Sequence, residues 1–149
     1  MSKKKIGIKN FLPHRDPMLM VAYLTHIDDT SAIGVFPITK DCVFTKNNAL
    51  QEPGLIENAA QVSSAVVGQS FFEKGDLKGE SNNITGYISA IKKVTIHKLP
   101  EIGDEIITKA KLVSRFDTEG VSICTIEGAI FNNDELIVAC TLNFLIHEI

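Results

Sequence analysis

Apolar and β-branched residues are concentrated in two stretches near the start of the chain, at residues 18–27 and 32–38. The polar run Asp28-Asp29-Thr30-Ser31 separates the two stretches. Stretches of this composition on either side of a turn-forming run are typical of paired antiparallel strands. The pattern therefore predicts a β-hairpin in this part of the chain.

A longer apolar segment begins at Pro53, after an irregular polar stretch at residues 40–51, and ends near residue 72. Proline is favoured in the first turn of a helix, and the segment continues without a breaker until Lys74-Gly75-Asp76. Its apolar residues occur nearly all the way around the helical axis, which is typical of a helix enclosed by other structure. We therefore expect one central helix of about five turns.

From residue 84 onward, stretches dense in Ile, Val, Thr and Phe alternate with the turn-forming runs 100–104, 117–120 and 132–135. This alternation predicts four strands joined by tight turns. Each strand would span about ten residues, more than the usual five or six, so the sheet should be long, twisted and curved.

The order of two strands, one helix and four further strands is typical of an α+β domain. A curved antiparallel sheet of this kind can wrap one central helix, which is the hotdog fold. Residues 1–149 contain no linker, internal repeat or low-complexity tract. We therefore expect a single hotdog domain, with the polar residues 73–83 forming a surface loop.

The overall composition fits a folded protein and excludes several classes. The 149 residues are 44% hydrophobic and 22% charged, with a formal net charge of -3, which gives no indication of nucleic-acid binding. No stretch approaches the roughly 18 consecutive apolar residues of a membrane span, and no apolar signal segment follows the lysine-rich start. We expect a cytoplasmic protein with neither a membrane nor a nucleic-acid partner.

The cysteines indicate neither disulfides nor metal binding. Cys42, Cys124 and Cys140 are odd in number and show no close Cys-x-x-Cys spacing, so we expect buried, reduced thiols. The chain also lacks the glycine-rich and zinc-binding motifs that hold nucleotides or metals. We therefore expect neither a metal nor a cofactor.

One stripe of the predicted helix carries polar or small residues. Successive helix positions turn by about 100°, so Glu57, Gln61, Ser64 and Gly68 fall on one narrow stripe. An ionised carboxylate that is buried costs several kcal/mol unless it is paired, so Glu57 needs a partner or a raised pKa, and either suits acid chemistry. The alternative is that the stripe faces solvent and that the helix dipole alone favours Glu57.

His14 is the histidine with the most constrained surroundings. It lies in residues 11–21 (FLPHRDPMLMV), the opening segment, where two prolines limit the freedom of the backbone. His26 and His97 fall within predicted strands and His147 near the end of the chain, where we expect packing or surface roles. A loop histidine without a function is the competing interpretation for His14 itself.

Three segments resemble the 3-hydroxyacyl-acyl carrier protein dehydratases and their hotdog-fold relatives. The opening segment resembles the family's Leu-Pro-His-Arg start, and residues 53–61 (PGLIENAAQ) resemble its Pro-Gly turn and helix. Residues 89–107 (SAIKKVTIHKLPEIGDEII) resemble its central strand and Pro-Gly-Asp turn. The three occur in the family's order over nearly the whole chain.

The resemblance also shows one departure. The family usually places its catalytic histidine in a His-Phe-Pro-Gly turn before the helix, whereas residues 45–54 (TKNNALQEPG) contain no histidine. Branches associated with aryl polyene and flexirubin-type pigment synthesis resemble this chain better, because they share the Pro-His-x-x-Pro-Met start and lack the later histidine. Glu57 corresponds to the family's helix carboxylate and Gln61 to the glutamine that follows it.

The resemblance implies dehydration of 3-hydroxyacyl thioesters, linked to acyl carrier protein or coenzyme A, in fatty acid or polyene and polyketide-type lipid synthesis. His14 and Glu57 are then the candidate catalytic residues, as base and as the group that protonates or orients the leaving hydroxyl. The candidate substrate-binding residues are Gly54, Gln61, Ser64, Ser89, Ala90 and Ile91.

The implied partners are an acyl carrier protein and a second copy of the chain. In the family the carboxylate and the histidine usually meet across a dimer interface, so we expect at least a homodimer. An acidic carrier favours a basic rim, for which Arg15, Lys92 and Lys93 are candidates. A hotdog acyl thioesterase and a non-catalytic, carrier-binding subunit are the alternative functions.

Overall fold

Seven strands form one antiparallel sheet in the order β1-β2-β3-β7-β8-β9-β6, and a single long helix, α1, packs against it. The computed structural model describes residues 4–68 and 84–148. A short hairpin of two further strands precedes the helix. The elements are β1 (Ile6–Gly7), a 3-10 turn (Ile8–Asn10), β2 (Tyr23–Ile27), β3 (Ser31–Pro37), β4 (Thr45–Lys46), β5 (Ala49–Leu50), α1 (Glu52–Gly68), β6 (Ile84–Ile96), β7 (Glu105–Thr118), β8 (Val121–Asn132) and β9 (Glu135–Glu148).

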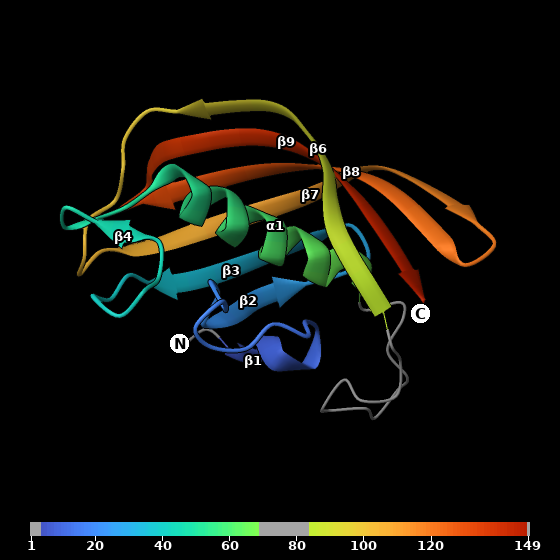
Figure 1. The fold of residues 1–149 in the computed structure, drawn as a ribbon, viewed down its shortest axis with the longest axis horizontal. Coiled ribbons are helices and arrows are strands. Elements are labelled where there is room, and N and C mark those ends of the chain that lie inside the picture. The colour runs from blue at the N-terminus through green and yellow to red at the C-terminus, as the bar shows by residue number, and fades with distance from the viewer. Residues whose placement is uncertain (1–3, 69–83, 149) are drawn as a thin grey trace.

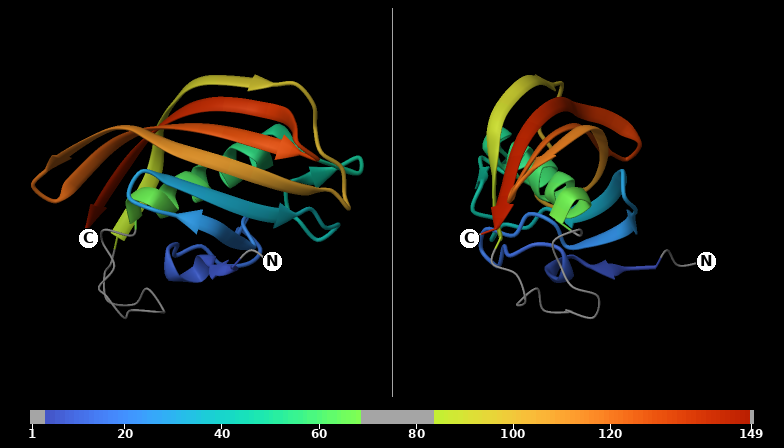
Figure 2. Two further views of the ribbon diagram at one scale, coloured as in Figure 1. Left: turned by 180° about the vertical axis from the view of Figure 1, so that it is seen from behind. Right: turned by 90° about the vertical axis from the view of Figure 1, so that its right-hand side faces the viewer.

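The sheet curves around α1, as the side and end views show (Figures 1 and 2). Alternate residues of the long strands face the helix, so β8 is buried at every second position along most of its length. The helix is enclosed as its sequence predicts, with Leu55, Ala59 and Val62 fully buried. These contacts confirm the predicted hotdog fold, in which one apolar helix lies inside a long curved sheet.

The predicted elements occur where the pattern indicated, with shifted boundaries. The first predicted strand is shorter, because residues 18–22 belong to no strand, and β2 begins at Tyr23 and pairs with β3. The helix begins one residue before Pro53. Its predicted last turn at residues 69–72 and the predicted loop at residues 73–83 lie outside the described residues.

Strand β6 is the main departure from the predicted order. It does not form a tight turn with β7, since residues 97–104 carry the chain across the sheet and β6 pairs with β9 instead. Among the described residues β6 pairs with no other strand, so its second edge lies open. The prediction of tight turns was wrong for this connection and right for the other two, β7 to β8 and β8 to β9.

Two asparagine-containing turns close hairpins, one short (β4–β5) and one long (β8–β9). Asn47 and Asn48 have φ values of 52° and 65°, and Asn133 and Asp134 have values of 48° and 64°. Asparagine and aspartate tolerate this left-handed region, which two-residue hairpin turns require. The first pair forms the β4–β5 hairpin, a feature that we did not predict within the polar stretch at residues 40–51.

Gly34 allows β3 to approach α1 closely. A Cβ atom added at this position would lie 2.6 Å from the Val62 Cγ2 atom and 3.2 Å from the Val21 Cγ1 atom. Val62 and Val21 are both buried, so neither can move away without disturbing the core. The absence of a side chain at residue 34 therefore sets the distance between helix and sheet.

We predict that Gly34→Ala lowers the free energy of unfolding by about 1–3 kcal/mol, because the new methyl group overpacks the core. Combining it with Val62→Ala should cost less than the sum of the two single substitutions, since the second removes the clashing atom. Denaturant unfolding of the two single variants and the double variant measures this. Additive losses would contradict the close approach.

Candidate active site

A cavity of about 220 Å³ lies beside α1, between the opening segment and the open side of the sheet. Side chains from the helix, the opening segment, β6 and β9 line it. The lining residues are His14, Glu57, Ala60, Gln61, Ser64, Gly86, Tyr87, Ile88 and Phe144. The predicted polar stripe of the helix therefore faces this cavity.

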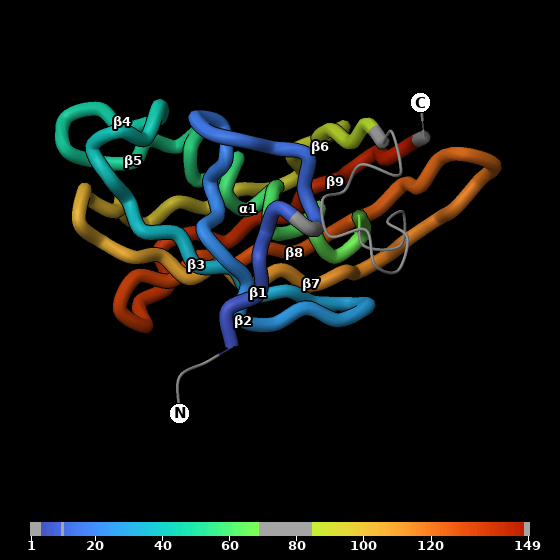
Figure 3. The backbone as a smooth tube through the Cα atoms, turned by 90° about the horizontal axis from the view of Figure 1, so that it is seen from below, coloured from blue at the N-terminus to red at the C-terminus, as the bar shows by residue number. Residues whose placement is uncertain are grey.

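The opening segment crosses α1 on the side that the sheet leaves uncovered, which is the side that faces the viewer in Figure 3. Leu12 anchors the start of the segment and Met20 its end, and both side chains are buried. Between them the Arg15 guanidinium donates hydrogen bonds of 2.8 Å to the carbonyl oxygens of Leu12 and His14. His14 is thus held between two buried anchors.

Two amide side chains of α1 bind the backbone of this segment. The Gln61 Nε2 atom donates to the Met18 carbonyl oxygen at 2.8 Å, and Gln61 Oε1 accepts from the Met20 N–H at 2.7 Å. Asn58 Nδ2 donates to the Met20 carbonyl oxygen at 2.7 Å, and Asn58 Oδ1 accepts from the Thr108 hydroxyl. The helix therefore supplies the backbone partners that a neighbouring strand would otherwise provide.

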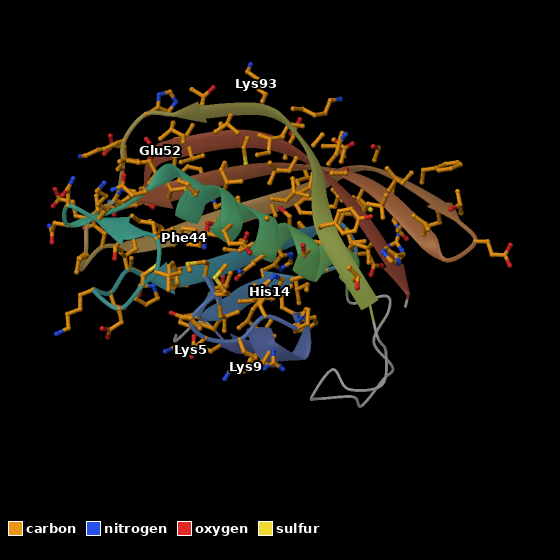
Figure 4. All side chains as sticks on the ribbon, viewed as in Figure 1. Lys5, Lys9, His14, Phe44, Glu52 and Lys93 are labelled. Carbon is orange, nitrogen blue, oxygen red and sulfur yellow. The ribbon has the colours of Figure 1, made fainter. Side chains whose placement is uncertain are left out.

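His14 and Glu57 meet at the wall of the cavity within one chain. The His14 Nε2 atom lies 3.7 Å from Glu57 Oε1, and the two side chains are 32% and 26% exposed. Glu57 Oε1 also accepts a hydrogen bond of 2.8 Å from Gln61 Nε2. The family pattern implied a meeting across a dimer interface, whereas the two side chains that approach here belong to the same chain. Figure 4 shows His14 beneath the helix, facing it.

Burial controls the protonation of His14. Removal from water lowers the pKa of the imidazole below its ordinary value of 6.5, the nearby Glu57 carboxylate opposes this, and Arg15 adds to it. The Nδ1 atom is buried and has no hydrogen-bond partner among the described residues. A neutral ring therefore predominates at neutral pH, and Nε2 is the nitrogen that faces Glu57.

A second, narrow cavity of about 30 Å³ continues beyond His14. It shares His14, Ser64 and Gly86 with the larger cavity and is otherwise lined mainly by apolar groups. Gly68, the last member of the predicted stripe, lies here. The stripe thus runs from Glu57, beside polar groups, to Gly68, among mainly apolar ones.

The remaining predicted substrate-binding residues lie away from this cavity. Gly54 is buried against Leu50 and Phe44, and its N–H donates to the Gln51 carbonyl oxygen at 3.0 Å. Residues 89–91 lie exposed on β6, one to three positions beyond Ile88, which does line the cavity. Binding roles for Gly54, Ser89, Ala90 and Ile91 stay predictions.

The other charged candidates divide between two sides of the molecule. Arg15 is exposed and adjoins His14, whereas Lys93 lines a hollow on the outer face of β6 and β9. Figure 4 shows Lys93 on the opposite side of the sheet from His14. Lys5 lies over the Tyr23 ring and lines a hollow on the outer face of β2, β3 and β7, whereas Lys9 lines a hollow beside Asp16 and Leu19 of the opening segment. His26 is exposed, its Nε2 atom lies 2.8 Å from Asp28 Oδ2, and it does not line the cavity.

Two general features of the described residues complete the description. No helix among them is long and apolar enough to cross a membrane. Within residues 4–68 and 84–148, no group of three or more His, Cys, Asp or Glu side chains is arranged to hold a metal ion.

Comparison with known proteins decides the family. A family model described as ApeP-like, ApeP dehydratase, matches residues 6–147. The chain belongs to the ApeP-like dehydratase family. This membership confirms the predicted divergent branch of hotdog dehydratases and the predicted enzyme class.

Curated relatives of this ApeP-like dehydratase include the 3-hydroxyacyl-[acyl-carrier-protein] dehydratase FabZ of two Clostridium botulinum strains. The protein of strain Okra / Type B1 is 28% identical over 138 residues, which cover 87% of this chain and 90% of the relative. The protein of strain Loch Maree / Type A3 is 27% identical over the same length and coverage.

Solved structures share the fold. A chain of the dehydratase heterocomplex ApeI:P from Xenorhabdus doucetiae superposes with a TM-score of 0.78 at 17% identity, covering 98% of this chain and 93% of that one. A hypothetical thioesterase with coenzyme A from Streptococcus pneumoniae TIGR4 gives 0.60 at 13% identity, with 84% of each chain covered. At these identities the likeness is one of fold.

Several residues around the site were not predicted from the sequence. Asn58 and Thr108 hold the opening segment, but they lie 50 positions apart and nothing local connects them. Gly86, Tyr87 and Phe144 line the cavity only because β6 pairs with β9. A buried amide one residue after Glu57 was the available signal for Asn58, since a polar side chain on an enclosed helix needs a partner.

We predict that nuclear magnetic resonance titration gives a pKa for His14 below 6.5. Glu57→Gln should lower this pKa further, because the carboxylate favours the charged imidazole. Glu52→Gln, a substitution on the first turn of the same helix, should leave it unchanged. A pKa that rises in Glu57→Gln, or that responds equally to both substitutions, would contradict the described geometry.

Proposed function

We propose that this chain eliminates water from 3-hydroxyacyl thioesters to give trans-2-enoyl thioesters, with His14 and Glu57 as the reacting pair. The observation that carries the proposal is the 3.7 Å approach of His14 Nε2 to Glu57 Oε1 on the wall of a partly apolar cavity. Elimination requires a base for the C2 proton and an acid for the departing hydroxyl, placed side by side.

His14 has the properties of the base. The pKa of its imidazole is lowered by burial, so the ring is unprotonated at neutral pH and can accept a proton. Because Nδ1 is enclosed, Nε2 is the atom that takes the C2 proton. The C2–H bond then breaks, and its electrons form the C2=C3 double bond.

Glu57 serves the leaving hydroxyl. The Glu57 carboxylate accepts a hydrogen bond from the C3 hydroxyl and orients it. As the C3–O bond breaks, the proton that His14 Nε2 took from C2 passes to the oxygen, and water departs. Because the proton taken from C2 leaves with the water, both residues end the reaction as they began it. Gln61 orients the carboxyl through its 2.8 Å hydrogen bond throughout.

We further propose that an acyl carrier protein delivers the substrate. The curated relatives are named as acyl-carrier-protein dehydratases. Arg15 and Lys9, which belong to or adjoin the opening segment, suit an acidic partner better than Lys93, which lies on the outer face of the sheet. Of the three residues expected to form a basic rim, Arg15 is therefore the one whose position suits a contact with the carrier.

The function predicts that the chain hydrates crotonyl-coenzyme A, the reverse reaction, as followed by the ultraviolet absorbance of the enoyl thioester. His14→Ala and Glu57→Gln should each reduce kcat/KM about a hundredfold or more, the usual loss when a general acid or base is removed. In the wild type, kcat/KM should fall as the pH drops through the lowered pKa of His14, because the base is then protonated.

Matched substitutions separate the alternatives. His26→Ala and Glu52→Gln, which change the same residue types outside the cavity, should keep wild-type rates. Release of free thiol from acyl-coenzyme A in place of enoyl hydration would favour a thioesterase. A wild-type chain that performs neither reaction would contradict the proposal and favour a non-catalytic carrier-binding subunit.

We also propose that a second copy of the chain pairs along β6. One edge of this strand has no partner among the described residues, and such an edge is a ready site for strand pairing. Ile91 pairs with the buried Leu142 and so lies on the helix side of the sheet, yet it is 54% exposed. A partner strand would cover it.

Sedimentation should then give a dimer for the wild type and a monomer for Ile91→Glu, because a charge at this position cannot be buried without a partner. Val113→Glu, a substitution at a residue that is 53% exposed on β7, is the matched control and should stay dimeric. A monomeric wild type, or a dimeric Ile91→Glu variant, would contradict pairing through this edge.

A further inference from the structure

We propose that Asn58, Gln61 and Thr108 are positioning residues that dock the opening segment onto α1 and thereby hold His14 against Glu57. The docking itself rests on the hydrogen bonds described above. Its consequence for catalysis rests on the proposed function. Asn58 and Thr108 lie outside the cavity lining and so act on the reaction only through the backbone that carries His14.

Met20 is the point at which the segment is held. Its N–H donates to Gln61 Oε1 and its carbonyl oxygen accepts from Asn58 Nδ2, each at 2.7 Å. Both backbone groups are thus bound by side chains of one helix, on a residue that is itself fully buried. A buried backbone group that loses its partner costs as much as a lost hydrogen bond, so the docked arrangement is strongly favoured over an undocked one.

Gln61 connects the docked backbone to the reacting carboxyl. Its two N–H groups are occupied by the Met18 carbonyl oxygen and by Glu57 Oε1, and its oxygen accepts from Met20. The side chain is 1% exposed. Because both donors are engaged and the amide is buried, Gln61 orients Glu57 relative to the segment. A substrate-binding role for Gln61, which also lines the cavity, stays a prediction.

Thr108 fixes the orientation of the Asn58 amide. Its hydroxyl, on β7 behind the helix, donates to Asn58 Oδ1, which directs Nδ2 toward Met20. Thr108 and Asn58 are both fully buried, so no water replaces either contact. A continuous path of hydrogen bonds therefore runs from the sheet through the helix to the segment that carries His14.

Apart from the burial of Leu12, Met20 and Val21, the opening segment has no regular structure that holds it in place. Residues 12–22 belong to no helix or strand, and β2 begins only at Tyr23. Arg15 stabilises the bend around His14 through hydrogen bonds to the carbonyl oxygens of Leu12 and His14. Both acceptors belong to the segment itself, so these bonds do not hold the segment against the helix. The amides of α1 provide that attachment.

A pair of substitutions at residue 108 tests the hydrogen bond separately from the packing. Thr108→Val keeps the shape and removes the hydroxyl, whereas Thr108→Ser keeps the hydroxyl and removes the methyl group. We expect Thr108→Val to lower kcat about tenfold with KM nearly unchanged, and Thr108→Ser to retain kcat within about twofold. Equal rates in the two variants would overturn the inference.

Asn58→Leu provides the stronger perturbation, and Ser63→Ala is its control. Ser63 is an equally buried polar residue of the same helix, but its hydroxyl donates to the Ala59 carbonyl oxygen of that helix and makes no hydrogen bond to the described part of the opening segment. We expect kcat to fall about a hundredfold in Asn58→Leu, as small misplacements of a catalytic group do, and to stay within about twofold in Ser63→Ala. Equal losses in both would indicate a merely structural role and overturn the inference.

Titration of His14 by nuclear magnetic resonance gives a readout that does not depend on activity. Undocking exposes the imidazole, so its pKa should rise toward the ordinary value in Asn58→Leu and Thr108→Val, and stay low in Ser63→Ala and Thr108→Ser. A wild type without dehydratase activity would refute the proposed function while these shifts still supported the docking. Unchanged His14 titration in Asn58→Leu would refute the docking even in an active enzyme.

Discussion

The two hydrogen bonds that α1 makes to the backbone of Met20 are the interaction on which the site depends. An apolar helix enclosed by a sheet cannot carry free polar groups, because each would lose its water without gaining a partner. Asn58 and Gln61 are therefore tolerated only where something binds them. The opening segment supplies that partner, and its position over the helix follows from this requirement.

The same helix combines packing and chemistry on different faces. Gly34 lets β3 lie close against one side of it, while the stripe that begins at Glu57 faces a cavity on the other. Partial burial of His14 in this cavity lowers the pKa of its imidazole, and the ring lies 3.7 Å from Glu57. The contacts that give the buried amides of the helix their hydrogen-bond partners are thus the same contacts that assemble the candidate active site.

Much of this could be predicted from local patterns. The enclosed helix, the polar stripe on it and the long strands follow from periodicity, and the prolines around His14 indicated a fixed backbone. The turn at Asn47 and Asn48 also carried a readable signal, since two such residues in succession favour a tight hairpin turn. The strands on either side have only two residues each, too few for an alternating pattern that would predict a hairpin.

The contacts that could not be predicted are those between distant parts of the chain. Nothing in the residues near Thr108 indicates Asn58 as its partner, and the pairing of β6 with β9 depends on a crossover that local patterns do not specify. The resemblance to dehydratases suggested that histidine and carboxylate meet between protomers. Only the fold shows that the opening segment bends back over its own helix.

The most direct test is therefore activity in mixed assemblies of His14→Ala and Glu57→Gln chains. If one chain supplies both groups, every mixed dimer contains only defective sites, and the co-expressed mixture should be as inactive as either variant alone. If the groups met across the interface, each mixed dimer would contain one intact site, and roughly a quarter of wild-type activity would return. Recovery of that activity would contradict the account.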